Sequence, residues 1–227
     1  MQFPKTKLLP QYHGKPSREN SIGYLVDNRG VRLPGVTRIM QATKSPLQKA
    51  QLTRWREKVG SVEANRVIQA SKKRGTIIHE LVSKYLLGQP YSCPDFVRPY
   101  WDNLLPILDN IDNIRLVEGN LFHYYLGYAG RVDCVASYLS IPCVIEFKTA
   151  ERFKPLYDEP LQLAAYCGAV NRQYGLRLRN TLLITTTPSE ASVTWFERDE
   201  VIKYWHLWEQ RVADFWKNNN VSGVAAS

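Results

Sequence analysis

The chain has 227 residues, of which 44% are hydrophobic and 22% charged, and its formal net charge is +9. This is the composition of a folded protein, so wholesale disorder and collagen-like repeats are excluded. No apolar run approaches the roughly 18–20 residues of a membrane span. The first residues also lack the apolar core of a secretory signal. We therefore expect a cytoplasmic protein without a membrane partner.

The charge is unevenly distributed along the chain. Residues 1–90 contain 17 Lys and Arg against 5 Asp and Glu, and residues 91–227 contain 13 against 16. A basic N-terminal third beside an acidic remainder favours a surface for a polyanion next to chemistry that needs carboxylates, although a solvated basic surface remains open. The four cysteines form no CxxC pair, so we expect buried, reduced thiols and no zinc held by cysteine.

The residue pattern predicts the following elements in chain order. A hairpin with its turn at 27–30 comes first, followed by helices over 46–59 and 61–87, the second with Ser61 as N-cap. A helix over 95–105, disturbed by Pro106, precedes strands over 114–125, 128–137 and 142–148. A helix over 159–174, strands over 181–187 and 192–196, and a helix over 199–217 complete the chain.

This order predicts an α/β fold with a mixed central sheet flanked by helices. We expect one domain, made of an N-terminal hairpin and basic helical segment over 1–90 and a core over 91–218. Residues 219–227 are expected to form a flexible tail.

Two carboxylates occupy adjacent predicted strands. If the turn covers 137–142, an antiparallel register places Val135 opposite Val144, and Asp133 opposite Glu146. Opposed carboxylates repel each other, and burial makes their charge costlier still. A bound Mg²⁺ or Mn²⁺ resolves the conflict, whereas a surface hairpin neutralised by Arg131 and Lys148 is the alternative. Lys148 shares the face of Glu146 and could orient a water molecule or stabilise developing charge.

Asp133 followed by Glu146-Phe147-Lys148 resembles the signature of the PD-(D/E)XK nuclease superfamily. The additional motifs RGTxxHE, GRxDxV and QxxxY resemble those of RecB-like nucleases. Together with the helical segment over 52–80, they closely resemble the small single-stranded-DNA exonucleases of phage and of the mitochondrial genome maintenance type. Val132 stands where the superfamily name has proline. The resemblance covers about 33–216 and implies a restriction-endonuclease-like core with an N-terminal helical arch through which a DNA strand passes.

The resemblance also implies roles for individual residues. His79, Asp133, Glu146 and the Phe147 carbonyl would hold the metal. Lys148 would be catalytic, with Gln162 and Tyr166 placed near the site by their i, i+4 spacing on one helix. Candidate contacts to nucleic acid are Arg54, Arg56, Arg66, Lys72, Lys73, Arg74 and Arg131. Trp55 and Tyr85 could stack on bases, although Trp55 also fits a core position, and Glu118 could support a second metal.

The sequence thus predicts a Mg- or Mn-dependent deoxyribonuclease that acts as an exonuclease on single-stranded DNA ends, in a bacterial or phage-infected cell. One alternative is another RecB-like recombination nuclease or the CRISPR-adaptation nuclease, whose iron–sulfur cluster needs four cysteines in a spacing that this chain lacks. The other alternative is a nucleic-acid-binding module without activity.

Overall fold

The structure is a computed structural model that describes residues 8–19 and 22–219. Its N-terminal part holds β1 (Lys15–Glu19), β2 (Ile22–Val26), β3 (Arg32–Pro34), α1 (Val36–Ala42), α2 (Pro46–Val59) and α3 (Ser61–Leu86). The remainder holds the 3₁₀ turn η1 (Asp95–Val97), α4 (Arg98–Leu108), β4 (Ile111–His123), β5 (Tyr128–Tyr138), β6 (Ile141–Thr149), α5 (Glu159–Tyr174), β7 (Asn180–Thr186), β8 (Ala191–Phe196) and α6 (Arg198–Asn218).

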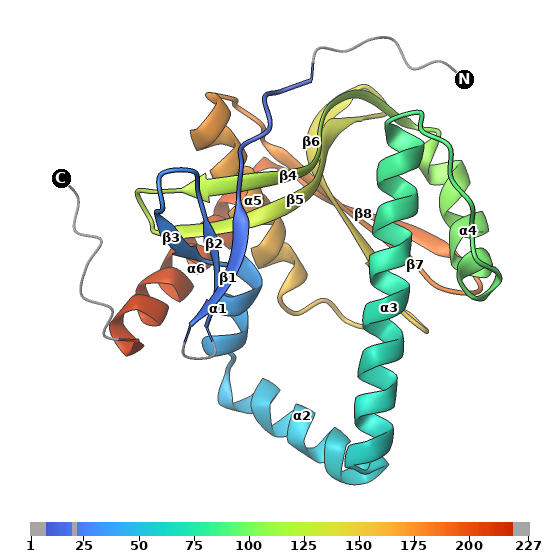
Figure 1. Ribbon diagram of the computed structural model, residues 1–227, viewed down its shortest axis with the longest axis horizontal. Coiled ribbons are helices and arrows are strands. Elements are labelled where there is room, and N and C mark those ends of the chain that lie inside the picture. Colours follow the sequence, from blue (N-terminus) through green and yellow to red (C-terminus); the bar gives the residue numbers. More distant parts are fainter. Residues whose placement is uncertain (1–7, 20–21, 220–227) are drawn as a thin grey trace.

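A five-stranded mixed sheet occupies the centre of the molecule (Figure 1). Its strand order is β4-β5-β6-β7-β8, and neighbours are antiparallel except for β6 and β7. Parallel neighbours cannot be joined by a tight turn, and α5 provides the crossover between them. The predicted α/β class with a mixed central sheet flanked by helices is therefore confirmed.

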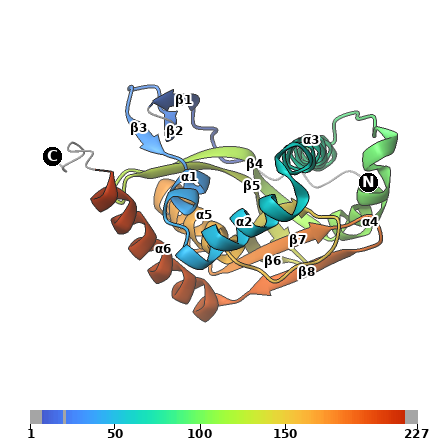
Figure 2. The same ribbon diagram turned by 90° about the horizontal axis from the view of Figure 1, so that it is seen from below.

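Helices cover both faces of this sheet because its strands alternate between two apolar clusters. On β6, Val144 packs in a cluster with Leu163 of α5 and Trp208 of α6. The next residue, Ile145, packs instead in a cluster with residues of α3 and α4 such as Ile78. Figure 2 shows α1 and α6 toward one end of the sheet and α3 with α4 toward the other.

The hairpin between β5 and β6 sets the register of the predicted acidic strands. Leu139 and Ser140 form its two-residue turn with φ of 49° and 66°, which is the left-handed backbone of a type I′ turn. The turn is shorter than the predicted 137–142 because both strands continue further. Val135 pairs with Val144 and Cys134 with Ile145, so the predicted register is confirmed up to the residues beside the two acids.

Helices α2 and α3 form a corner that stands away from the sheet (Figure 1). A capping box between Ser45 and Gln48 starts α2, and α2 buries none of its residues. Gly60, with φ of 81°, is both the C-cap of α2 and the N-cap of α3, so the prediction of Ser61 as N-cap is wrong. We call α2 and the first half of α3, residues 46–73, the arch.

Apart from Ala64, the buried residues of α3 all lie in its second half. Ile78, Val82 and Leu86 lie on one face of the helix and are buried, but Val67, three turns earlier on the same face, is 41% exposed. The apolar face therefore continues in the sequence beyond the part of α3 that packs on the sheet. Its first half therefore presents side chains to the space below the sheet.

Short elements near the N-terminus were not expected from the sequence. Strand β1 joins the predicted β2–β3 hairpin in a small sheet, and α1 adds Val36, Ile39 and Met40 to the core. Residues 8–12 run along β4, where the Leu9 amide donates to the Arg115 carbonyl. No helix in the described part of the chain is both long and apolar enough to cross a membrane. The predicted tail lies outside the described residues, except for Asn219, which caps α6.

Candidate active site

Three carboxylates stand side by side on adjacent strands. Val117 pairs with Cys134 and Gly119 with Val132, so Glu118 of β4 lies opposite Asp133 of β5. The β5–β6 register, extended by one residue, brings Glu146 to the other side of Asp133. Such a row of like charges is unfavourable for folding unless cations lie among them.

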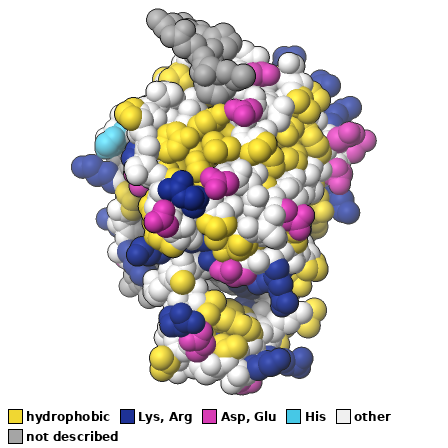
Figure 3. Space-filling model, turned by 90° about the vertical axis from the view of Figure 1, so that its right-hand side faces the viewer, with side chains coloured by type: hydrophobic (Ala, Val, Ile, Leu, Met, Phe, Trp, Pro, Cys, Tyr) yellow, Lys and Arg dark blue, Asp and Glu magenta, His cyan; other side chains and the backbone are white. Residues whose placement is uncertain are grey.

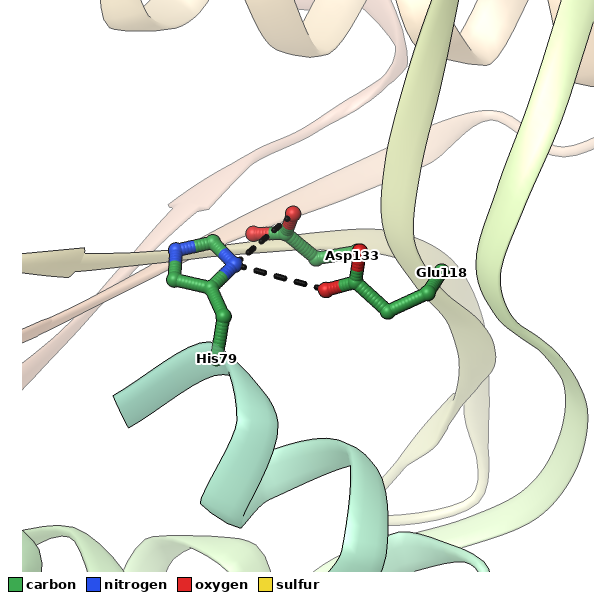
Figure 4. Close-up of side chains that lie close together, drawn as sticks. All are labelled: His79, Glu118 and Asp133. Atoms are coloured by element: carbon green, nitrogen blue, oxygen red, sulfur yellow. Dashed lines mark ion pairs between the residues drawn. The ribbon is translucent and has the colours of Figure 1, made fainter. Parts of the chain in front are cut away.

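One positive charge comes from His79 on α3. Its imidazole points toward Asp133 and Glu118 (Figure 4). Its Nδ1 lies 3.2 Å from Asp133 Oδ1 and 3.5 Å from Glu118 Oε1. Burial on its own would lower the pKa of His79, but the bonds to Asp133 and Glu118 outweigh it and raise that pKa to about 10. The imidazole therefore carries a proton when no metal is bound.

The backbone aims two of these acids. Glu118 has a φ of 49°, a left-handed conformation uncommon for glutamate, and the following Gly119 leaves no room for a Cβ beside Leu116. Asp133 accepts a hydrogen bond of 2.8 Å from the Phe147 amide to its Oδ2, which leaves Oδ1 toward His79. Asp133 is thus oriented by the neighbouring strand β6, and Glu118 by the conformation of its own backbone.

Glu146 is the most buried acid of the row, with only 2% of its surface exposed. Its Oε1 accepts a 2.7 Å bond from Lys148 Nζ, whereas its buried Oε2 has no hydrogen-bond partner among the described residues. Burial and the neighbouring charge of Asp133 raise the pKa of Glu146 to about 8 against the opposing effects of Lys148 and His79. An unsatisfied buried carboxylate oxygen is costly, and a cation would satisfy it.

Lys148 belongs to a polar chain that extends into α5. Its Nζ also donates to Gln162 Oε1 at 2.9 Å, and Gln162 Nε2 donates to the Tyr166 hydroxyl at 3.1 Å. Burial would lower the pKa of Lys148, but the charges of Glu146 and Asp133 raise it overall. The amine is therefore a fixed positive charge, and α5 holds its position through an i, i+4 pair.

These residues can hold a hard divalent cation. Ligand atoms of His79, Glu118 and Asp133 all lie within 4.8 Å of one another, and this is the one such group found among residues 8–19 and 22–219. The group contains no cysteine. Carboxylate oxygens with an imidazole suit Mg²⁺ or Mn²⁺, and the unpartnered oxygen of Glu146 next to Asp133 fits the same ion chemistry.

The group found in the structure shares His79 and Asp133 with the predicted ligands, contains Glu118 in addition, and includes neither Glu146 nor Phe147. The sequence ranked Glu146 with His79 and Asp133 and treated Glu118 only as support for a second metal. In the structure Glu118 is in direct reach of His79, whereas Glu146 contacts Lys148. The Phe147 carbonyl as a metal ligand stays a prediction, and the observed contribution of Phe147 to the site is its amide on Asp133.

Of the three acids, Glu118 lines a cavity of about 600 Å³ between α3 and strands β4 and β5. Gly75, His79, Glu118 and Arg131 are among its lining residues. A Cβ at Gly75 would meet only Thr149 Oγ1, at an ordinary contact distance of 3.9 Å, so α3 leaves open space on this side. Arg131 lies at the exposed side, with its guanidinium 3.7 Å from Glu118 Oε2.

All but one of the other predicted nucleic-acid contacts are exposed on the arch. Exposed side chains on the arch are Arg54, Arg56, Arg66, Lys72 and Lys73. Figure 3 shows Lys and Arg side chains, mixed with acidic ones, on the lobe that the arch forms below the sheet. Arg66 pairs with Glu63 at 2.7 Å.

Arg74 differs from the rest of this basic run because it is buried. It contacts Glu151 and lies 4.8 Å above the ring of Tyr100, so it ties α3 to the segment that follows β6. Trp55 is half-buried on α2, a helix with no buried residue. The expectation that it fits a core position is therefore wrong.

The fold and site define an α/β protein with a carboxylate, histidine and lysine centre. Comparison with known proteins places it among exonucleases. It is 31% identical over 229 residues to mitochondrial genome maintenance exonuclease 1 of Mus musculus, covering 92% of this chain and 67% of that protein. The proteins of the same name from Xenopus tropicalis and Homo sapiens are 30% and 29% identical, covering 82% and 83% of this chain. The chain belongs to the mitochondrial genome maintenance exonuclease 1 family.

The chain spans 67%, 58% and 60% of the length of these three relatives. No protein-family model matches it. The crystal structure of SSO0001 overlaps 72% of this chain at 20% identity with a TM-score of 0.40, a likeness too low to support any conclusion. The relatives are vertebrate proteins named for the mitochondrion, so the expected bacterial or phage setting has no support.

Proposed function

We propose that this chain is a divalent-metal-dependent DNA exonuclease of the PD-(D/E)XK, RecB-like kind that acts on single-stranded ends. Its family supports exonuclease activity. The observation that carries the metal dependence is the buried, unpartnered Oε2 of Glu146 beside the Glu118–Asp133–His79 group. A protein selected only for stability would not keep three neighbouring acids in this position.

His79, Glu118 and Asp133, with Glu146 adjoining them, would hold Mg²⁺ or Mn²⁺. When bound, the ion would supply Lewis-acid polarisation of the scissile phosphate and acidify a water molecule. The Phe147 amide keeps Asp133 oriented, and the charged amine of Lys148 is placed to stabilise negative charge that develops on the phosphate. Gln162 restrains that amine, so the positive charge needs little reorganisation during the reaction. Water attacks directly, and no covalent intermediate with the protein is required.

Burial of the acids favours a single strand as substrate. Asp133 and Glu146 are less than one tenth exposed, and their neighbours Glu118 and His79 line the cavity beside α3, so the phosphate would approach the acids through that cavity. A stiff duplex cannot follow such a path, whereas a flexible single strand can bend into it. The basic arch of the 1–90 segment would guide the strand through phosphate contacts, and residues 91–218 would supply the nuclease core.

The decisive experiment digests oligonucleotides labelled at the 5′ or the 3′ end. Linear single-stranded, linear double-stranded and circular single-stranded DNA are each incubated with Mg²⁺, with Mn²⁺ or with EDTA. We expect stepwise shortening of the linear single strand only with a divalent ion, and no cutting of the circle.

Two variants accompany the wild-type protein. Asp133→Asn should be inactive, whereas Asp102→Asn, an exposed acid on α4, should cleave like the wild type. DNA binding without cleavage by the wild-type protein under every metal condition would instead identify a binding module. Equal cleavage in EDTA would refute the metal dependence.

A further inference from the structure

A second cavity of about 300 Å³ adjoins the candidate site on the side of Lys148. The first cavity is lined by His79 and Glu118, and the second shares none of its lining residues. A continuous set of contacts joins them, since His79 meets Asp133, Asp133 neighbours Glu146, and Glu146 binds Lys148. A phosphate held at the acids would therefore have one flanking nucleotide toward each cavity.

The walls of the second cavity combine apolar and hydroxyl side chains. Two of these side chains come from the segment after β6, and four come from the adjacent strands β7 and β8. On these strands Leu183 pairs with Thr194, and Thr185 pairs with Ser192. These six wall residues are Phe153, Leu156, Leu183, Thr185, Ser192 and Thr194. A lining that combines an aromatic ring with hydroxyl groups suits a nucleobase and its sugar, because bases offer both a stacking face and polar edges. The volume lies at the small end of the usual range for ligand pockets, roughly 300–1,000 Å³, so it suits one nucleotide rather than several.

Phe153 is not required for the core of the protein. Its side chain is 40% exposed, and Leu156 beside it is exposed to the same extent. Two large apolar side chains held at the rim of a polar cavity are unusual for folding alone. Lys148 and Lys154 line the cavity against the single acid Glu159, so its charge suits a nucleotide phosphate.

We propose that this cavity binds the nucleotide adjoining the scissile phosphate and that Phe153 stacks on its base. The inference rests on the proposed nuclease function and adds to it a base-binding subsite. The subsite accepts any base, because stacking depends on the face of the ring and not on the hydrogen-bonding groups at its edge. Its effect is to fix the position of the phosphodiester relative to Lys148.

The test places one abasic nucleotide at successive positions of a single-stranded oligonucleotide and measures cleavage at each bond. For the wild type we expect slower cleavage, by at least about 5-fold, when the abasic nucleotide occupies the subsite, because aromatic stacking on one base contributes roughly 1–3 kcal/mol. Phe153→Ala should slow cleavage of intact DNA by a similar factor and should no longer distinguish the abasic position. Phe153→Trp should restore the slower cleavage of DNA that has the abasic nucleotide in the subsite.

Tyr157→Ala is the matched control, since Tyr157 is an exposed aromatic of the same segment that does not line the cavity. A second readout does not need cleavage. The fluorescence of 2-aminopurine deoxynucleoside monophosphate is followed in EDTA, and quenching is expected with the wild type and Tyr157→Ala but not with Phe153→Ala.

The two failures are distinguishable. If the wild type cleaves no DNA with either metal, the proposed function is wrong. If the wild type cleaves DNA but the abasic position has no effect, or Phe153→Ala keeps both the abasic effect and the quenching, the subsite is wrong and the nuclease function stands.

Discussion

Replacing Glu146 by glutamine should make the metal-free protein more stable while abolishing its activity. Glutamine keeps an oxygen for the bond from Lys148 Nζ and removes the buried carboxylate whose Oε2 has no partner. Folding moves the pKa of this carboxyl from 4.5 to about 8. At pH 7 that shift costs about 3 kcal/mol, which the variant avoids. For a chain of this size the gain corresponds to an increase in Tm of roughly 6–12 °C.

The sign of the pH dependence follows from the same shift. Because the pKa of Glu146 is higher in the folded state, the wild type loses stability as the pH rises from 4.5 through about 8. The difference in Tm between Glu146→Gln and wild type should therefore grow between pH 6 and pH 8.5 in EDTA. Circular dichroism melting checks this, with Glu57→Gln, an exposed acid on α2, as the control that changes nothing. A Glu146→Gln protein no more stable than the wild type at pH 8.5 would refute the reasoning.

Three further predictions concern the polar chain and the arch. Lys148→Ala should lower kcat by at least about 100-fold with little change in DNA affinity measured by fluorescence anisotropy, because a fixed positive charge near the phosphate is lost; an active variant would contradict this role. Tyr166→Phe removes the hydroxyl that accepts from Gln162 and should lower kcat roughly tenfold without changing KM; an unchanged kcat would show that Lys148 does not depend on α5. DNA affinity should fall with salt, and Lys72→Ala combined with Lys73→Ala should make the slope of log K against log salt shallower by about 1.4; an unchanged slope would exclude these two lysines from phosphate contact.

The part of the site that lies on one hairpin was predictable from the sequence. Strand alternation and a short turn determine which residues of β5 and β6 face each other, and the observed pairs Val135–Val144 and Cys134–Ile145 confirm that register. Gln162 and Tyr166 were equally predictable as neighbours, because helical spacing alone brings them together on α5.

Contacts between distant segments were harder to predict. Glu118 reaches His79 only because β4 pairs with β5 in one register and because its backbone takes a left-handed conformation, and the single local signal was the glycine that follows it. Arg74 lies in a basic run that composition marks as solvated, yet Glu151 and Tyr100 bury it from segments far along the chain. Strand β1 and helix α1 are too short for a periodic pattern to indicate them.

The two halves of helix α3 differ greatly in how much they pack against the rest of the protein. Its second half carries Ile78, Val82 and Leu86 into the core, whereas residues of its first half, such as Val67, face solvent. The first half buries only Ala64, and a helix segment with so little packing is only marginally stable in water. Backbone amides of the first half should therefore exchange with deuterium far sooner than those of the second half. One continuous helix thus combines a rigid anchor for His79 with a segment that can unwind and reform locally at little cost to the rest of the molecule.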